Sequence, residues 1–223
     1  MKIVIDGNIG AGKTTQLDLL DRRGIKVVRE PLDKWPLALF YTDMKRWALT
    51  LQLSILQTHQ PLQTHRLVVY ERSLLASRYV FWENMKHKGF VTPEEDEVHE
   101  RAFETYVWRP DVYIYLATEP HDAYDRVKRR HGQAGDSGIT LDYLESIHDL
   151  YEKLILRMPC CVHVIKVGKK QPEEIHAEIL GILSEYTGDG VHVSDSGRKK
   201  VQAARAHRRS MLCTPFPNVC NMS

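Results

Sequence analysis

The stretch Gly7-Asn8-Ile9-Gly10-Ala11-Gly12-Lys13-Thr14 follows the short apolar run 2–6 and precedes a helical pattern that extends to about residue 22. It matches G-x-x-x-x-G-K-[ST], the P-loop, in which glycines let successive backbone N–H groups turn toward a phosphate. Strand, glycine-rich turn and helix in this order are the context that the motif requires. A chance match is the alternative, and a Rossmann loop fits less well because the glycines do not follow G-x-G-x-x-G.

The residue types in this loop predict which groups bind phosphate and metal. Lys13 would place a positive charge at the β- and γ-phosphates, and the Thr14 hydroxyl would bind Mg²⁺. The positive end of the helix dipole points at the same place. We therefore predict a nucleotide-phosphate site formed by Asn8, Ile9, Gly10, Ala11, Gly12, Lys13, Thr14 and Thr15.

The composition is that of a soluble globular protein, with 43% hydrophobic and 27% charged residues in a chain of 223. No run reaches the ~18 apolar residues of a membrane span. Because a strand is predicted from residue 2, we expect no signal or transit peptide. The four cysteines lack metal-ligand spacing, which suggests reduced thiols in the cytosol or nucleus. We expect one domain over residues 1–186 and a basic, mostly disordered tail over 187–223, with six Lys/Arg against two Asp.

Apolar strand patterns alternate with helical patterns along the whole domain. The predicted strands are 2–6, 25–29, 67–70, 112–116 and 162–167. The predicted helices are 14–22, 37–60 in two pieces, 74–88, 92–107, 120–130, 141–156 and 172–186. This order predicts an α/β fold, a three-layer α/β/α P-loop NTPase type with a five-stranded parallel sheet and a short lid.

Phosphate-handling or acid–base groups follow three of these strands, at the carboxyl ends where ligands of such folds bind. The P-loop follows the first strand, Glu30 the second, and Glu71 with Arg72 the third. Glu71 stands where a Walker B acid would hold Mg²⁺, although an exposed strand-end acid is the alternative. Arg72 could carry charge to a transferring phosphoryl group, or be a structural partner of Glu71. Glu30 is the candidate general base, with a solvated acid before Pro31 as the alternative.

A basic helix end precedes a glycine-rich loop at residues 125–138. Arg126 and Arg130 are four residues apart and therefore share one helix face. This arrangement suits a lid that closes over phosphates. The alternative is an ordinary positive helix end that complements the helix dipole.

Together these motifs resemble the deoxynucleoside kinases, a family that includes mitochondrial thymidine kinase, insect deoxynucleoside kinase and deoxycytidine kinase. The resemblance covers about residues 1–180 and is carried by Gly7–Thr15, Glu30–Trp35, Glu71–Ser73, Ser77–Asn84 and the Arg126/Arg130 pair. It implies transfer of the ATP γ-phosphate to the 5′-hydroxyl of a deoxynucleoside, with Mg²⁺. The short chain would also suit a virus-encoded member.

The resemblance assigns catalytic roles residue by residue. Glu30 is similar to the family's 5′-hydroxyl base, Arg72 to the arginine beside that hydroxyl, and Glu71 to the Mg²⁺-associated acid. Lys13 keeps its role at the transferred phosphate. Arg126 and Arg130 are similar to the lid arginines, although Gly132 replaces a further arginine common there.

The resemblance also implies an acceptor pocket. Its expected members are Trp35, Tyr41, Leu51, Gln52, Ser77, Phe81 and Asp136, in addition to Glu30 and Arg72. Tyr41 and Asp136 would hold the 3′-hydroxyl, with Asp one methylene shorter than the usual Glu. Gln52 would read the base edge, because an amide can donate and accept at once. Ser77 replaces the aspartate of deoxycytidine kinase and resembles the enzymes that accept thymidine.

We therefore expect a Mg²⁺/ATP-dependent deoxynucleoside kinase that prefers thymidine and also accepts deoxycytidine. By resemblance it would be a homodimer through helices near 40–60 and 73–107, open to feedback by a deoxynucleoside triphosphate. A cytoplasmic location fits, in the host if the chain is viral; the tail leaves nuclear entry open but predicts no specific nucleic-acid binding. The alternatives are a thymidylate kinase and a non-catalytic P-loop switch, although no N-K-x-D motif is present.

Overall fold

The structure is a computed structural model that describes residues 1–64, 66–129 and 138–187. Its centre is a five-stranded sheet with the order β2-β3-β1-β4-β5. Every neighbouring pair of strands is parallel. The strands are β1 (Lys2–Asp6), β2 (Val27–Val28), β3 (Val68–Glu71), β4 (Val112–Ala117) and β5 (Cys161–Lys166). The predicted α/β fold with a five-stranded parallel sheet is thus confirmed.

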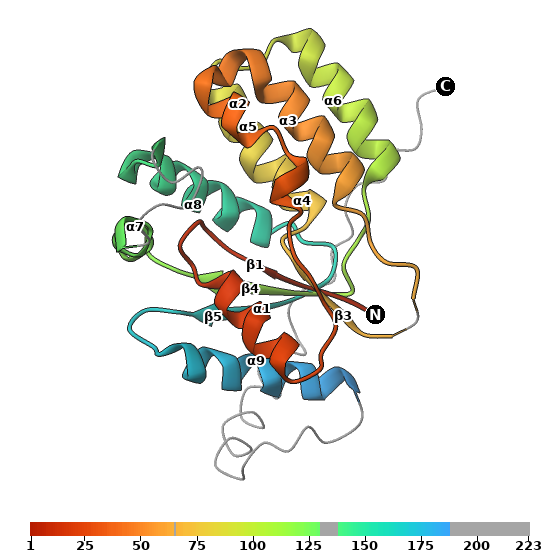
Figure 1. Cartoon of the computed structure of the whole chain (residues 1–223), viewed down its shortest axis with the longest axis vertical. Helices are drawn as coiled ribbons and strands as arrows, with labels where there is room; N and C mark the ends of the chain where they lie inside the picture. Colours follow the sequence, from red (N-terminus) through yellow and green to blue (C-terminus); the bar gives the residue numbers. More distant parts are fainter. Residues whose placement is uncertain (65, 130–137, 188–223) are drawn as a thin grey trace.

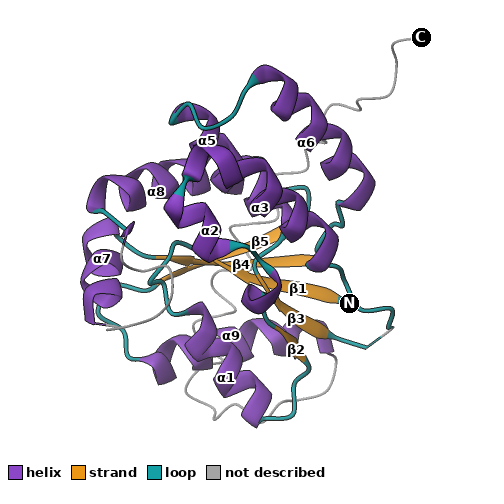
Figure 2. Ribbon diagram, turned by 45° about the horizontal axis from the view of Figure 1, so that its top comes forward, coloured by secondary structure: helices purple, strands orange, loops and turns teal. Residues whose placement is uncertain are grey.

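Helices cover both faces of the sheet (Figure 1). They are α1 (Lys13–Arg22), α2 (Leu37–Thr42), α3 (Met44–Thr58), α4 (Leu74–Ala76), α5 (Glu83–His87), α6 (Pro93–Tyr106), α7 (Pro120–Arg129), α8 (Leu141–Ile155) and α9 (Pro172–Thr187), with a 3₁₀ turn η1 (Leu32–Lys34) and a π-helical segment η2 (Ser77–Trp82). Figure 2 shows α1 and α9 on one face and α3, α6 and α8 on the other. No helix in the described part of the chain combines the length and apolar character needed to cross a membrane.

The two faces of the sheet differ in chemistry. The α1/α9 face is aliphatic, with Ile3 and Ile5 packed among leucine, isoleucine and valine. The α3/α8 face carries three buried strand tyrosines together with one from α8: Tyr70, Tyr113, Tyr115 and Tyr151. Because side chains alternate along a strand, Asp6 shares the tyrosine face with Val4. A buried carboxylate is thereby surrounded by hydroxyl groups.

The observed elements differ from the expected ones at three places. β2 is limited to Val27–Val28 rather than 25–29, because it pairs only with β3 at the sheet edge and soon reaches Pro31, which cannot donate to a ladder. Glu71 is the last residue of β3 rather than the residue after it, since it still pairs with Ile5. The single helix expected over 74–88 contains the π segment η2, a feature that often marks functional sites.

His99 of α6 provides a test of the packing. Its ring is fully buried and stacks on Trp82, with ring centres 4.0 Å apart. Burial, followed by the charge of Arg78, lowers the pKa of His99 to about 3. Below about pH 6.5 the imidazole of the unfolded chain becomes protonated, whereas the buried imidazole of the folded chain stays neutral until the pH approaches 3. The free energy of unfolding is therefore highest above pH 6.5 and decreases as pH falls toward 3.

We expect the free energy of unfolding to drop by about 1–2 kcal/mol between pH 7 and pH 5 through His99 alone. In His99→Phe this part of the pH dependence should disappear, as measured by urea denaturation at both pH values. His87→Gln, at an exposed histidine of α5, is the control and should keep the wild-type dependence. An unchanged pH dependence in His99→Phe would contradict the assignment.

Candidate active site

The P-loop lies after β1, at the carboxyl ends of the strands, and it is pressed against α7. Gly10 has φ +85°, and a Cβ atom added to it would lie 2.5 Å from the Ala123 carbonyl oxygen. Asn8 fixes the other side of the loop, because its side-chain amide donates to the Leu144 carbonyl at 2.8 Å and accepts from the Ile9 N–H. The loop is thus held between α7 and α8.

Lys13 points back into this loop. Its Nζ donates to the carbonyl oxygens of Gly7 at 3.0 Å and Asn8 at 2.9 Å. Burial, followed by the positive charge of Arg72, lowers the pKa of Lys13 to about 7. A phosphate that enters the loop would restore the charge of this ammonium group.

Thr14 and Glu71 form the pair of oxygens predicted for a metal. The Thr14 hydroxyl donates to Glu71 Oε1 at 2.8 Å, and the Glu71 carboxylate is buried. Within residues 1–64, 66–129 and 138–187 no three His, Cys, Asp or Glu side chains gather as a metal cage. The donor set nevertheless fits Mg²⁺, which takes few protein oxygens and completes its shell with water and phosphate.

Arg72 is held in a left-handed backbone conformation, with φ +58°. Its N–H donates to the Ile5 carbonyl at 3.0 Å, so the turn begins where the β3–β1 ladder ends. This turn aims the guanidinium at Glu30, where Nη1 lies 2.6 Å from Oε2. The alternative that Arg72 is a structural partner of Glu71 is therefore wrong, because the Glu71 carboxylate accepts a hydrogen bond from Thr14 instead.

Glu30 reaches this centre from the chain just after β2. Its side chain is 12% exposed and its carboxylate faces Arg72. Burial raises the pKa of Glu30, and the neighbouring charge of Glu71 adds to this, while Arg72 and Lys13 oppose it. The carboxylate therefore holds a proton more strongly than a solvated glutamate does, and the alternative of a solvated acid is wrong.

The expected pocket wall is built from α3 and the segment η2. The Ser77 hydroxyl donates to Gln52 Oε1 at 2.5 Å, and both side chains are buried. Leu51 and Trp35 belong to one buried apolar cluster, and the Trp35 indole N–H donates to Thr58 at 2.8 Å. The Phe81 ring faces Arg72, with the guanidinium carbon 4.9 Å from the ring centre.

The structure describes one of the two lid arginines. Arg126 donates to the Gly168 carbonyl at 3.0 Å rather than to the P-loop, although its neighbour Ala123 touches that loop. Arg130 and Asp136 lie outside the described residues, as does the tail from 188. Tyr41 lies beside Gly138, with its ring 3.8 Å from where a Cβ on that glycine would stand.

Comparison with known proteins adds to this geometry. A protein-family model described as "Deoxynucleoside kinase" matches residues 3–183. The chain belongs to the deoxynucleoside kinase family. Mitochondrial thymidine kinase 2 of Macaca fascicularis is 37% identical to it over 172 residues. That alignment covers 70% of this chain but only 64% of the length of the monkey protein. The "Probable deoxycytidine kinase" of fowlpox virus is 29% identical over 212 residues, 89% of this chain and 83% of that one.

Solved structures agree on the fold. Deoxyadenosine kinase from M. mycoides superposes with a TM-score of 0.74 over 83% of this chain and 99% of that one, at 21% sequence identity. At that identity the likeness establishes a shared architecture and no shared substrate. The resemblance to the deoxynucleoside kinases expected from the motifs is confirmed.

Two groups in this kinase-family site are absent from the residues predicted from the motifs. Asp6 accepts hydrogen bonds from the hydroxyls of Tyr113 and Tyr151, each at 2.6 Å, and lies under the P-loop. His59 places Nε2 3.3 Å from the Arg72 carbonyl oxygen. An acid at the carboxyl end of β1 is a signal that could have been used for Asp6, whereas no pattern links His59 to Arg72.

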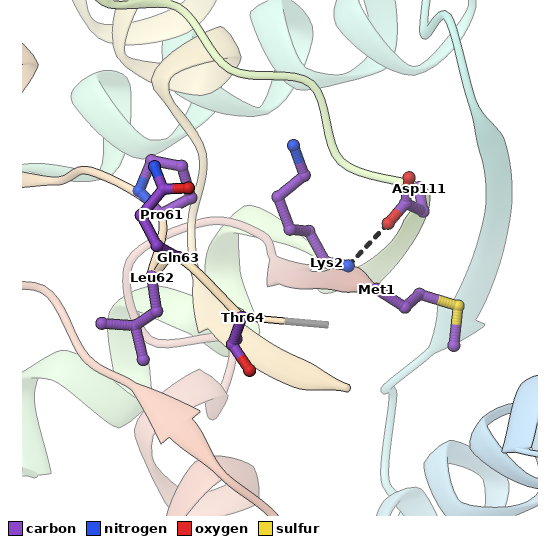
Figure 3. Close-up of a pocket in the computed structure, with 7 residues that line it drawn as sticks. All are labelled: Met1, Lys2, Pro61, Leu62, Gln63, Thr64 and Asp111. Atoms are coloured by element: carbon purple, nitrogen blue, oxygen red, sulfur yellow. Dashed lines mark hydrogen bonds between the residues drawn. The ribbon is translucent and has the colours of Figure 1, made fainter. Parts of the chain in front are cut away.

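A separate pocket lies at the other end of the strands, at their amino ends. Figure 3 shows its lining residues, Met1, Lys2, Pro61, Leu62, Gln63, Thr64 and Asp111. Asp111 accepts from the Lys2 N–H at 2.7 Å and so is engaged in holding the start of β1. This pocket lies at the amino ends of β1 and β4, away from the P-loop and Glu30.

Proposed function

We propose that the chain is a Mg²⁺/ATP-dependent deoxynucleoside kinase that transfers the γ-phosphate of ATP to the 5′-hydroxyl of a deoxynucleoside. The observation that carries this is the Glu30–Arg72 pair, joined at 2.6 Å and close enough to Lys13 for each charge to act on the others. A kinase needs a proton acceptor at the attacking hydroxyl and positive charge at the moving phosphoryl group. Both lie beside the P-loop here.

Each residue then has a defined task. The buried Glu30 accepts the proton of the 5′-hydroxyl, and Arg72 with Lys13 offsets the negative charge of the transferring phosphoryl group. Thr14 and Glu71 would hold Mg²⁺, which neutralises charge on the phosphate oxygens. The lid residues Arg126 and Arg130 would reach the donor phosphates, and Tyr41 with Asp136 the 3′-hydroxyl.

The Gln52–Ser77 pair supports thymidine together with deoxycytidine as acceptors. Thymine presents a donor at N3 and an acceptor at O4, whereas cytosine presents an acceptor and a donor, so Gln52 must turn its amide over between them. The Ser77 hydroxyl can follow either orientation, because it both donates and accepts. Thymidine preference is further supported by the thymidine kinase 2 relative.

A thymidylate kinase is the rival proposal. Its acceptor is already a phosphate and would not need a buried carboxylate as base, which disfavours it here. A nucleotide-binding switch would have no use for a buried Glu30–Arg72 pair opposite the P-loop. The test is phosphate transfer from radiolabelled ATP to the four deoxynucleosides and to thymidine monophosphate. We expect labelled thymidine and deoxycytidine monophosphates; a product from thymidine monophosphate alone, or from none, would overturn the proposal.

A homodimer is proposed through the α2–α6 region, where Leu39 and Val98 are 46% and 39% exposed. Light scattering would measure its mass. Feedback by a deoxynucleoside triphosphate is proposed because M. mycoides deoxyadenosine kinase is described with bound dCTP and dATP. Action in the cytoplasm of an infected host is proposed from the viral relatives.

A further inference from the structure

We propose that Tyr151 and Asp6 are positioning residues, which hold the Arg72 guanidinium and tie it to the first residue of the P-loop. The inference rests on the proposed function, since it concerns the arginine assigned to the transferring phosphoryl group. Tyr151 comes from α8 and Asp6 from the end of β1, so the device joins parts of the chain 145 residues apart.

The Tyr151 hydroxyl connects the two charged groups. It donates to Asp6 Oδ1 at 2.6 Å and accepts from Arg72 Nε at 3.4 Å. Arg72 Nε itself lies 3.8 Å from the same carboxylate oxygen. With Nη1 on Glu30, the guanidinium is therefore held at both ends, by the candidate base on one side and by Tyr151 on the other.

Aromatic rings fix the remaining freedom of this arginine. The Tyr151 ring packs edge-on against Phe81, with ring centres 6.3 Å apart, and the Phe81 face lies under the guanidinium. Tyr151 also stacks on Tyr115 of β4 at 5.5 Å. Its hydroxyl is thus held in place by the tyrosine face of the sheet and needs no reordering when substrate binds.

Asp6 connects the support of Arg72 to the P-loop. Its side chain has no exposed surface, and a buried carboxylate requires hydrogen-bond donors or opposite charge. Oδ1 accepts from the Gly7 N–H at 2.8 Å as well as from Tyr151, and Oδ2 accepts from Tyr113 at 2.6 Å. One carboxylate therefore contacts the first P-loop glycine and the group that supports Arg72.

This arrangement predicts an effect on turnover rather than on binding. Deleting the Tyr151 hydroxyl removes the only hydrogen bond that the described residues give to Arg72 Nε. The guanidinium then keeps its bond to Glu30, the longer 3.8 Å contact with Asp6 and the Phe81 ring, which position Nε less tightly. A misplaced guanidinium charge stabilises the transition state less, which lowers kcat. The acceptor pocket and the P-loop keep their structure, so KM changes little. The Tyr113 hydroxyl provides a matched control, because it bonds the same carboxylate without touching Arg72 in the described contacts.

The experiment compares Tyr151→Phe and Tyr113→Phe in the full chain, with wild-type phosphorylation of thymidine measured first. We expect kcat to fall by at least about 10-fold in Tyr151→Phe with KM values within about 3-fold, and by less than about 3-fold in Tyr113→Phe. Equal losses in the two variants would overturn the positioning role. A wild type that phosphorylates no deoxynucleoside would instead contradict the proposed function.

A double-mutant cycle separates positioning from support of the fold. Arg72→Lys keeps the charge but removes Nε, so adding Tyr151→Phe should then change single-turnover rates by less than about 2-fold. Additive losses would show that Tyr151 acts independently of Arg72 and overturn the proposal. If Tyr151→Phe does not fold, Asp6→Asn replaces it in the same cycle, with the same expected and contradicting results.

Discussion

Glu30→Gln should lower kcat for thymidine at least ~100-fold while the protein folds normally. The amide keeps an oxygen that can accept from Arg72 Nη1, so the 2.6 Å contact survives without the basic carboxylate. The loss measures proton acceptance from the 5′-hydroxyl rather than loss of the pocket. Steady-state kinetics with thymidine and ATP, together with circular dichroism and thermal unfolding of both proteins, would test this.

The pH profile provides a second measurement on the same variant. A general base acts when deprotonated, so activity is present above the pKa of Glu30 and is lost as pH falls through it. Burial raises that pKa, which moves the acidic limb of kcat/KM upward from the ~4.3 of a free glutamate. This limb should be absent from the residual activity of Glu30→Gln. Turnover within a few-fold of wild type would exclude Glu30 as the base.

Lys13→Met should reduce kcat by about 10²–10³-fold, because it removes a buried charge at the phosphates without shortening the side chain much. Lys13 is only 6% exposed, so an uncharged residue of similar length fits its place. Lys153→Met, at an exposed position on α8, is the matched control and should leave turnover unchanged. Loss of less than about 10-fold would show that the phosphates are neutralised by other groups.

Nucleotide binding should also take up a proton through Lys13. In the free protein its pKa is about 7, so at pH 8 most molecules carry a neutral amine there, and bound phosphate would recharge it. Calorimetry of ATP binding in buffers of different ionisation enthalpy should give a larger proton uptake at pH 8 than Lys13→Met gives at the same pH. Near pH 6, where the Lys13 amine is mostly protonated before ATP binds, wild type and Lys13→Met should differ little.

Local chemistry explains why part of the site could be predicted from the residues alone. The P-loop, Glu30 and Glu71 lie directly beside apolar runs, so their place at the carboxyl edge follows from parallel topology. The left-handed turn at Arg72 could not be predicted, because a positive φ at a non-glycine residue is imposed by surrounding contacts.

Hydrogen bonds between residues far apart in the chain could not be predicted either. In the sequence, Tyr151 fits one apolar position of an amphipathic helix, and only the packing of α8 on the tyrosine face brings its hydroxyl to Asp6. The Ser77–Gln52 bond depends on η2, whose π geometry has no signal in this sequence. For β2 the sequence predicted too long a strand, because its apolar run has only one neighbouring strand, β3, to pair with.

The contact between Gly10 and α7 has a consequence for how this enzyme family can diversify. The atoms that a Cβ at Gly10 would meet belong to the main chain of Ala123, so at this point the P-loop and α7 approach each other through backbone atoms. Side chains further along α7 can therefore be exchanged without shifting the helix from the loop. A side chain larger than glycine at position 10 would therefore have to push α7 away from the phosphate-binding loop.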